Sequence, residues 1–220
     1  MTKIENKNMN ESYYNSQYFE YQQSRGEFGG FVNQMIFKDH IGNDDILLDF
    51  GCGGGFLLKN LQCKKRIGIE INESAAMVAR ENGIEVHSSI EDIDENSVDT
   101  IISFHALEHT HNPLKEMQGL YKALKKGGKA IIVIPCESIK WKFIKDNVDQ
   151  HLYTWSPMCI GNLMTLAGFN ISEAKPYYYQ WIVSKRPIIV KLFGWKGYHF
   201  CCKLYGYLGP IYQVKVIATK

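Results

Sequence analysis

The stretch ILLDFGCGGG, residues 46–55, decides the fold of this chain. An apolar run ends in an acid, and a glycine-rich segment follows at once. This order predicts a buried strand that leads into a tight loop, where the backbone can approach a ligand closely. A second short apolar run, residues 66–69, ends in Glu70, which is placed to accept hydrogen bonds from ribose hydroxyls. Together the two runs indicate a nucleoside cofactor.

Length and composition indicate a single globular domain. With 220 residues the chain can bury a sizeable core, and its net charge of +2 gives no nucleic-acid footprint. The polar N-terminus lacks the apolar segment of a secretory signal, and no run reaches the roughly 18 apolar residues of a membrane span. The six cysteines show neither C-x-x-C pairs nor zinc spacing. We therefore expect reduced thiols and a cytoplasmic protein.

Strands and helices alternate from residue 45 onward, which predicts a parallel, doubly wound α/β sheet. Apolar residues in 31–41 favour a further helix that packs on this core, and residues 170–175 and 213–219 form a final antiparallel pair at the sheet edge. The expected strands are 45–50, 66–70, 84–87, 100–104 and 130–134, the last stopped by Pro135. The expected helices are 55–62, 72–82, 113–125 with a C-cap at Lys126-Gly127-Gly128, and 157–167.

The glycine loop does not fit a dinucleotide. The dinucleotide fingerprint G-x-G-x-x-G needs a third glycine, or an alanine, where helix and strand pack closely. Counted from Gly51 that position is Phe56, and counted from Gly53 it is Leu58. A nicotinamide cofactor is therefore disfavoured on steric grounds, and the compact loop favours a cofactor without a pyrophosphate.

Four motifs resemble those of class I S-adenosylmethionine-dependent methyltransferases, in order and at family spacing. DFGCGGG at 49–55 resembles the first motif of that family, and GIEIN at 68–72 resembles the second. VDTIISFHALEH at 98–109 resembles the block around the fourth strand, and LKKGGKA at 124–130 resembles the turn into the fifth. The resemblance covers roughly residues 40–175.

The resemblance implies a Rossmann-like, seven-stranded, mostly parallel sheet of order 3-2-1-4-5-7-6 with helices on both faces. It implies an N-terminal tail and helical cap over 1–40, a methyltransferase domain over 41–220, and an aromatic insertion over 177–212 before the last strand. It also implies S-adenosylmethionine as the methyl donor and S-adenosylhomocysteine as the product.

Cofactor contacts follow from the same resemblance. The backbone of Gly51, Cys52, Gly53 and Gly55 is expected against the methionine portion of the cofactor. Asp49 holds the loop or receives the cofactor ammonium group, and Glu70 takes both ribose hydroxyls. The adenine is expected between Ile71 and Ile90. Ser89 stands where the family usually carries an acid after the third strand, and Phe104 ends the fourth strand beside the cofactor.

Three histidines are candidates for the general base that a hydroxyl acceptor usually needs and a neutral amine does not. His105 ends the fourth strand, His109 closes the LEH block after it, and His151 lies in a block that resembles small-molecule methyltransferases. Each also has a structural alternative, in packing or in bracing a loop.

We expect no metal ligands among the site residues. One hypothesis runs against this: some ubiquinone-pathway O-methyltransferases bind a divalent cation at the positions that correspond to His105, Glu108 and His109, with Glu at the first. Unchanged activity after exhaustive chelation would remove that hypothesis.

The expected acceptor is a small molecule, methylated on oxygen or nitrogen, with a sugar or surface-polysaccharide intermediate as one candidate. The tyrosines at 13, 14, 18 and 21, with the glycines that follow, favour either a lid over the cofactor or a helix docked on the core. The aromatic and basic segment 177–212 has three readings: a pocket wall, a dimer interface, or a surface that meets a membrane. We expect no nucleic-acid partner and either a monomer or a homodimer.

Three other functions stay open at this point. An NAD(P)-dependent oxidoreductase is disfavoured by Phe56 and Leu58. A non-catalytic binding protein is disfavoured by the intact Asp49, glycines and Glu70. A nucleic-acid methyltransferase would favour a basic face and often an Asn/Asp-Pro-Pro-Tyr/Phe motif, where this chain has FHAL at 104–107.

Overall fold

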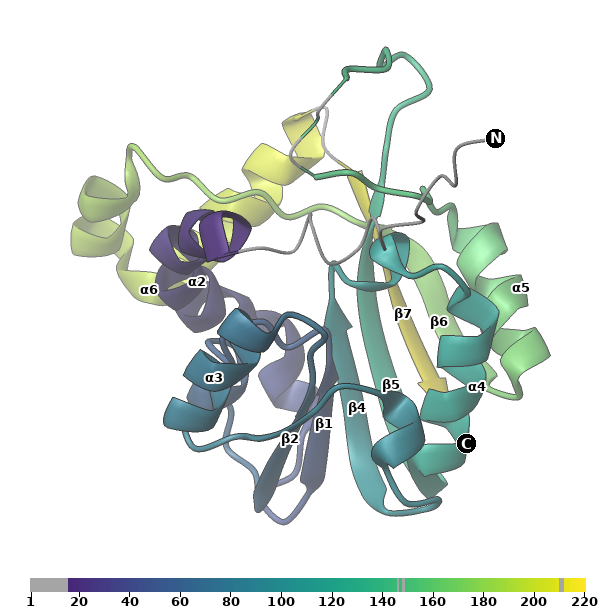
Figure 1. Ribbon diagram of the computed structural model, residues 1–220. Coiled ribbons are helices and arrows are strands. Elements are labelled where there is room, and N and C mark those ends of the chain that lie inside the picture. The colour runs from purple at the N-terminus through teal and green to yellow at the C-terminus, as the bar shows by residue number, and fades with distance from the viewer. Residues whose placement is uncertain (1–15, 146, 148, 210–211) are drawn as a thin grey trace, which may run out of the picture.

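In the computed structural model, which describes residues 16–145, 147, 149–209 and 212–220, a seven-stranded sheet lies between two layers of helices (Figure 1). The strand order is β3-β2-β1-β4-β5-β7-β6. Neighbours from β3 to β5 pair in parallel, and β7 pairs antiparallel to both β5 and β6. The predicted sheet order and the antiparallel pair are therefore confirmed. The strands are β1 (Ile46–Phe50), β2 (Lys65–Ile69), β3 (Glu85–His87), β4 (Val98–Phe104), β5 (Leu124–Cys136), β6 (Asn170–Tyr177) and β7 (Tyr212–Thr219).

Helices cover both faces of the sheet (Figure 1). On one face lie α4 (Pro113–Ala123) and α5 (Pro157–Ala167), and on the other lie α2 (Ser16–Phe37), α3 (Glu73–Glu81) and α6 (Arg186–Leu208). The neighbours Leu47 and Leu48 of β1 join different buried clusters, one on each face. A central parallel strand is buried on both sides, which is why β1 is a continuous apolar run rather than an alternating one.

Capping side chains set the helix starts as the sequence predicts. The Asn72 Oδ1 accepts hydrogen bonds from the backbone N–H groups of Ser74 and Ala75 at the start of α3. The Ser156 hydroxyl accepts from the N–H of Cys159, with Pro157 in the first turn of α5. That helix ends at Gly168, whose φ of 114° requires a glycine.

Three local predictions are wrong. The segment 55–62 forms only a short 3-10 helix, Leu58–Asn60. The Arg66 guanidinium donates hydrogen bonds to the carbonyl oxygens of Leu58 and Leu61, at 2.9 and 2.7 Å, so these carbonyls are not used to continue a helix. Helix α4 ends at Ala123 without the predicted glycine cap, since Leu124 is already extended and begins β5.

Strand β5 also runs through Pro135 to Cys136 instead of stopping before it. The proline lacks only a donor, and its carbonyl still accepts a hydrogen bond from the N–H of Trp155.

Helix α2 forms the cap that the sequence predicts, and it lies over the loop that follows β1. A Cβ on Gly30 would lie 2.1 Å from the carbonyl oxygen of Phe56, and one on Gly29 would lie 2.7 Å from the Trp181 ring. These glycines therefore serve close packing within a continuous helix. Tyr13 and Tyr14 lie outside the described residues, and the division of the chain at residue 40 stays a prediction.

The 177–212 segment contains α6, which kinks at Gly194, where φ is 64° and ψ is −176°. Its inner face packs on α2: the rings of Trp195 and Phe31 lie 4.7 Å apart edge to face, and Tyr198 is fully buried. Among the described residues, no helix has the length and apolar character that a membrane crossing needs.

The contact between α2 and the loop after β1 gives the first testable prediction. We expect Gly30→Ala to lower the free energy of unfolding by about 1–3 kcal/mol, because the new methyl group meets a backbone oxygen that cannot move alone. The matched control is Gly161→Ala in α5, where the nearest atom to a new Cβ lies 3.8 Å away. That variant should be neutral or more stable by about 0.5–1 kcal/mol. Urea unfolding measures both, and equal stability of the two variants would contradict the packing role of Gly30.

Candidate active site

A cleft of about 430 Å³ opens at the carboxyl ends of the parallel strands, and Glu70, Ile71, Ser89, Ile90 and His109 are among its lining residues. A second hollow of about 290 Å³ is lined by Asp49, Cys52 and Phe104 together with α2 and Trp181. Gly51, Gly53 and His105 line both. The strand order reverses between β1 and β4, so the two hollows flank the point where open α/β sheets bind their ligands. Together they suit one elongated ligand that passes the glycine loop.

The glycine loop owes its shape to left-handed backbone conformations. Gly51, Gly53 and Gly55 have φ of 77°, 52° and 72°, which side chains disfavour. A Cβ on Gly51 would also lie 2.3 Å from the Cβ of Ala106, and the Gly51 N–H donates to the carbonyl of Ile69 at 2.9 Å. The loop is thereby held between the ends of β2 and β4, with its backbone facing both hollows.

Glu70 ties the glycine loop to the segment that follows β2. Its Oε2 accepts a hydrogen bond of 2.8 Å from the Gly53 N–H, and its Oε1 accepts one of 2.8 Å from the Asn72 N–H. Burial raises the pKa of Glu70, while the backbone donors oppose that rise. Each oxygen keeps a further lone pair for a ligand hydroxyl.

Asp49 lines the second hollow, and one of its carboxylate oxygens has no hydrogen-bond partner among the described residues. Its side chain is buried, and the oxygen without a partner is Oδ1. Burial raises the pKa of Asp49 well above its usual value, and the nearby Glu70 adds to the rise. A buried, unpartnered carboxylate beside a glycine loop fits a cationic ligand group, which would supply the missing partner.

His105 is held by Gln213 of β7. The Gln213 amide donates to the carbonyl of Tyr179 at 2.7 Å, so its Oε1 is left to accept from the His105 Nε2 at 3.1 Å. The imidazole stacks on Phe104 at 4.4 Å, and burial lowers its pKa to about 4. The Nε2 therefore acts as a donor and is not free to take a proton.

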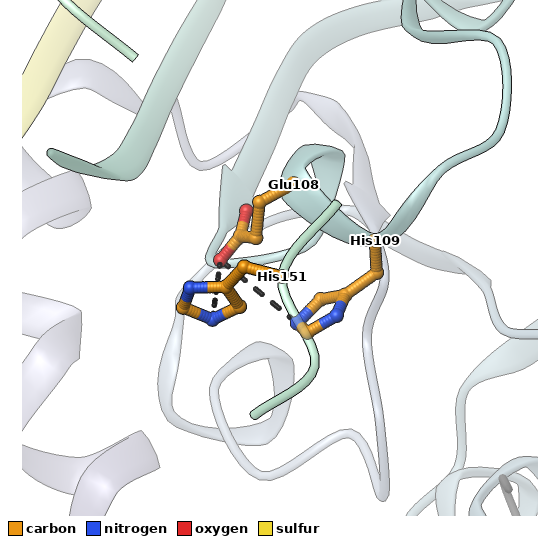
Figure 2. Close-up of side chains that lie close together, drawn as sticks. All are labelled: Glu108, His109 and His151. Atoms are coloured by element: carbon orange, nitrogen blue, oxygen red, sulfur yellow. Dashed lines mark ion pairs between the residues drawn. The ribbon is translucent and has the colours of Figure 1, made fainter. Parts of the chain in front are cut away.

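The other two histidines meet around Glu108 (Figure 2). Oε1 of Glu108 lies 4.0 Å from Nε2 of His109 and 3.9 Å from Nε2 of His151, and the two rings are 5.0 Å apart. Behind them, Oε1 of Glu137 lies 2.6 Å from Nδ1 of His151. His109 lines the cleft, so the cluster contacts the ligand space through that residue.

Burial dominates the electrostatics of this cluster. The Glu108 side chain is fully buried, and neither carboxyl oxygen has a hydrogen-bond partner among the described residues. Desolvation raises the pKa of Glu108 to about 8 and lowers that of His109 to about 4, the latter helped by the charge of His151. At neutral pH Glu108 is therefore mostly protonated and His109 is neutral.

The structure does not bring together all three residues of the hypothesised cation site, His105, Glu108 and His109. The imidazole of His105 turns to Gln213, and His151 takes its place beside Glu108 and His109. Ligand atoms of these last three residues lie within 4.8 Å of one another, the only such group of three found among the described residues.

The comparisons with known proteins agree with this geometry. A family model described as a methyltransferase domain matches residues 19–174. The chain belongs to this methyltransferase family. A ubiquinone biosynthesis O-methyltransferase of Rickettsia bellii is 27% identical over 194 aligned positions, which cover 74% of this chain and 80% of the relative. This relative is named for transfer to oxygen.

Solved structures share the fold of this methyltransferase. The methyltransferase of Haloferax volcanii, solved in complex with its Trm112 activator, superposes with a TM-score of 0.67 at 13% identity, over 94% of this chain and 96% of that one. An S-adenosylmethionine-dependent enzyme of Thermotoga maritima, named a possible histamine N-methyltransferase, gives 0.63 at 19% identity, over 91% and 94%. Membership of the methyltransferase family excludes the NAD(P)-dependent oxidoreductase alternative, and S-adenosylmethionine is the cofactor.

Sequence reasoning missed Glu137 and Gln213 of this methyltransferase. Glu137 directly follows β5, so an acid at the carboxyl end of a parallel strand was a usable signal. Gln213 lies on a strand from the far end of the chain, and nothing in the sequence links it to His105.

The bridge made by Glu70 predicts the behaviour of the cofactor site. We expect Glu70→Gln to weaken S-adenosylhomocysteine binding by about tenfold to a hundredfold, because one charged acceptor is lost. The control is Glu73→Gln, since Glu73 begins the next helix but is exposed and pairs only with Arg80 among the described residues. Isothermal titration calorimetry measures both, and unchanged affinity of the Glu70 variant would contradict its contact with the cofactor.

The buried Glu108 predicts a pH dependence of stability. Its pKa is about 8 in the folded chain against 4.5 for an unperturbed glutamate, so the folded state holds the extra proton between these values. Stability from this group therefore falls as pH rises from 4.5 to 8. We expect the melting temperature of Glu108→Gln to fall less than that of the wild type between about pH 6.5 and 8. Exposed Glu81→Gln is the control, and parallel curves for all three proteins would contradict a buried protonated Glu108.

Proposed function

We propose that this methyltransferase transfers a methyl group from S-adenosylmethionine to an oxygen of a small molecule, with His109 as the general base. The observation that supports it is the cluster of Figure 2, because His109 lines the cofactor cleft while its Nε2 faces the buried Glu108. Transfer to nitrogen is the second candidate, and a sugar or polysaccharide intermediate remains one candidate acceptor.

The residues around the two hollows fit the cofactor. The unpartnered Oδ1 of Asp49 suits its ammonium group, and the free lone pairs of Glu70 suit its ribose hydroxyls. Ile71 and Ile90 supply apolar surface for the adenine, with Ser89 beside them, and Gly51, Cys52, Gly53 and Phe104 also line the hollows. Gly55 lines neither hollow, and its predicted contact would be made only through the shape that it gives the loop. When bound, the cofactor supplies a methyl group on a positively charged sulfur, which leaves as a neutral thioether.

His109 has the properties of a proton acceptor. Its low pKa keeps the imidazole neutral at pH 7, the form that can take a proton from an acceptor hydroxyl. Oε1 of the Glu108 carboxyl lies 4.0 Å from Nε2, so a carboxyl oxygen faces the ring that takes the proton. His151 is a positioning residue in this proposal, because its contact with Glu137 holds its ring beside His109 and Glu108. His105 orients the end of β4 through Gln213.

Oxygen is favoured over nitrogen by this arrangement. A neutral amine attacks without prior loss of a proton, whereas a hydroxyl gains from a base. The relative from Rickettsia bellii is named for transfer to oxygen, which supports the same choice.

The free cysteines support the cytoplasm as the compartment.

Turnover by variants tests the proposal. The assay follows S-adenosylhomocysteine release with a panel of phenols, sugar alcohols and amines. With a hydroxyl acceptor we expect His109→Ala to lower kcat by about a hundredfold to ten-thousandfold. Its affinity for S-adenosylhomocysteine should stay unchanged, which separates a loss of base from a loss of the cofactor site. We expect exhaustive chelation to leave turnover unchanged.

His87→Ala is the matched control, because His87 lies on β3 and pairs only with Glu85 among the described residues. Full activity of His109→Ala with a hydroxyl acceptor would overturn the base. Turnover only with amines would favour the nitrogen alternative. Activity that chelation removes and zinc or manganese restores would assign the cluster to a cation instead.

A further inference from the structure

A solvent-exposed apolar tip extends from the connection between β5 and α5. Residues 139–145 have the sequence IKWKFIK, in which aromatic and aliphatic residues are interspersed with lysines. We call this segment the 139–145 tip. Figure 1 shows the connection rising beyond the carboxyl end of the sheet, away from both helical layers.

The apolar side chains of the tip are exposed. Ile139 is 101% exposed, Phe143 93%, Ile144 69% and Trp141 55%. None of the four belongs to either buried cluster of the described residues. Water-exposed apolar groups gathered on one short segment mark a contact site, because a chain gains nothing from leaving them in water.

The base of the connection is fixed although its tip is exposed. The Glu137 N–H donates to the Thr154 hydroxyl at 2.7 Å, the Trp155 N–H donates to the carbonyl of Pro135 at 3.3 Å, and His151 pairs with Glu137. These bonds hold the two ends of the connection together beside the Figure 2 cluster. The tip is therefore part of a loop whose two ends are hydrogen-bonded to each other.

Charge identifies the occupant of this surface. Lys140, Lys142 and Lys145 are exposed, the tip contains no acid, and none of the ion pairs among the described residues includes these lysines. The connection holds three acids: Glu137 precedes the tip and pairs with His151, whereas Asp146 and Asp149 follow the tip. Lysines are depleted in protein interfaces, whereas lysines beside exposed Trp and Phe suit anionic lipid headgroups over an apolar layer.

We propose that the 139–145 tip binds the surface of an anionic lipid bilayer, with its apolar side chains in the headgroup region and its lysines at the lipid phosphates. Three lysines and four apolar side chains supply two separate attractions, electrostatic and hydrophobic. Binding places the carboxyl end of the sheet, and with it the cleft, toward the bilayer. The proposal does not depend on the identity of the methyl acceptor.

Vesicle co-sedimentation with the full chain tests this surface. The probes are phosphatidylcholine vesicles and vesicles in which about one third of the lipid is phosphatidylglycerol. We expect binding to the anionic vesicles and weaker binding to the neutral ones. The triple variant Lys140→Glu, Lys142→Glu, Lys145→Glu should lower the partition coefficient on the order of a hundredfold. Phe143→Ser with Ile144→Ser should lower it by about tenfold or more.

Matched controls come from other parts of the surface. Lys64, Lys126 and Lys129 are exposed near the amino ends of β2 and β5, and their change to Glu alters the net charge equally. Met158 and Leu166 of α5 are 72% and 71% exposed, and their change to Ser removes a comparable apolar area. Because Met158 and Leu166 belong to α5 and lie outside the tip, we expect the apolar control to bind vesicles as the wild type does. The charge control should lose far less affinity for the anionic vesicles than the tip triple variant does.

Several results would overturn the proposal. One is the absence of vesicle binding, and another is equal loss in the tip and control variants. Self-association that the Phe143 and Ile144 changes abolish, without vesicle binding, would assign the tip to contact between copies. His109→Ala should bind vesicles as the wild type does, so a failure of the proposed methyl transfer leaves this test unaffected. Unchanged S-adenosylhomocysteine affinity verifies that the tip variants fold.

Discussion

The two hydrogen bonds accepted by Glu70 are the constraint on which the site depends. One carboxylate ties the glycine loop after β1 to the first turn of the chain after β2, at 2.8 Å on each side. The loop contains several glycines with positive φ, and fixing such residues costs conformational entropy that these hydrogen bonds help to offset. Because the carboxylate is buried, these bonds also offset its own desolvation. The same group that shapes the cleft thus presents acceptors inside it.

Helix α2 extends this arrangement to the second hollow. Glycines of α2 let that helix touch the backbone at Phe56, and Trp181 donates a hydrogen bond to Asn33 of the same helix at 3.1 Å. The second hollow is therefore walled by segments from opposite ends of the chain. A Cβ at Gly29 would meet the Trp181 ring and one at Gly30 would meet the backbone at Phe56, so both glycines are needed for this wall to pack closely.

On the other side of the cleft, the buried Glu108 is energetically unfavourable. Fully burying Glu108 without a hydrogen-bond partner among the described residues costs free energy, and the rise of its pKa to about 8 reflects that cost. Strongly shifted groups that line or adjoin a cleft are characteristic of sites where protons move. The Glu137 contact holds His151 in place, so the cluster keeps its geometry while its charge state is free to change.

From the sequence, the alternation of local apolar runs predicted the α/β sheet, and the family resemblance implied its strand order, which the structure has. The glycines and the strand-end acids predicted where the cofactor binds. The sequence also supplied Asp49, Glu70, His109 and His151 as site residues. It misjudged the segment 55–62, since the Arg66 side chain that takes its carbonyls comes from the next strand. Only the tertiary structure decided which partner each histidine has: His105 hydrogen-bonds to Gln213, whereas His151 lies beside Glu108. Each of these pairings joins residues that lie far apart in the chain, and no local pattern records contacts over such separations.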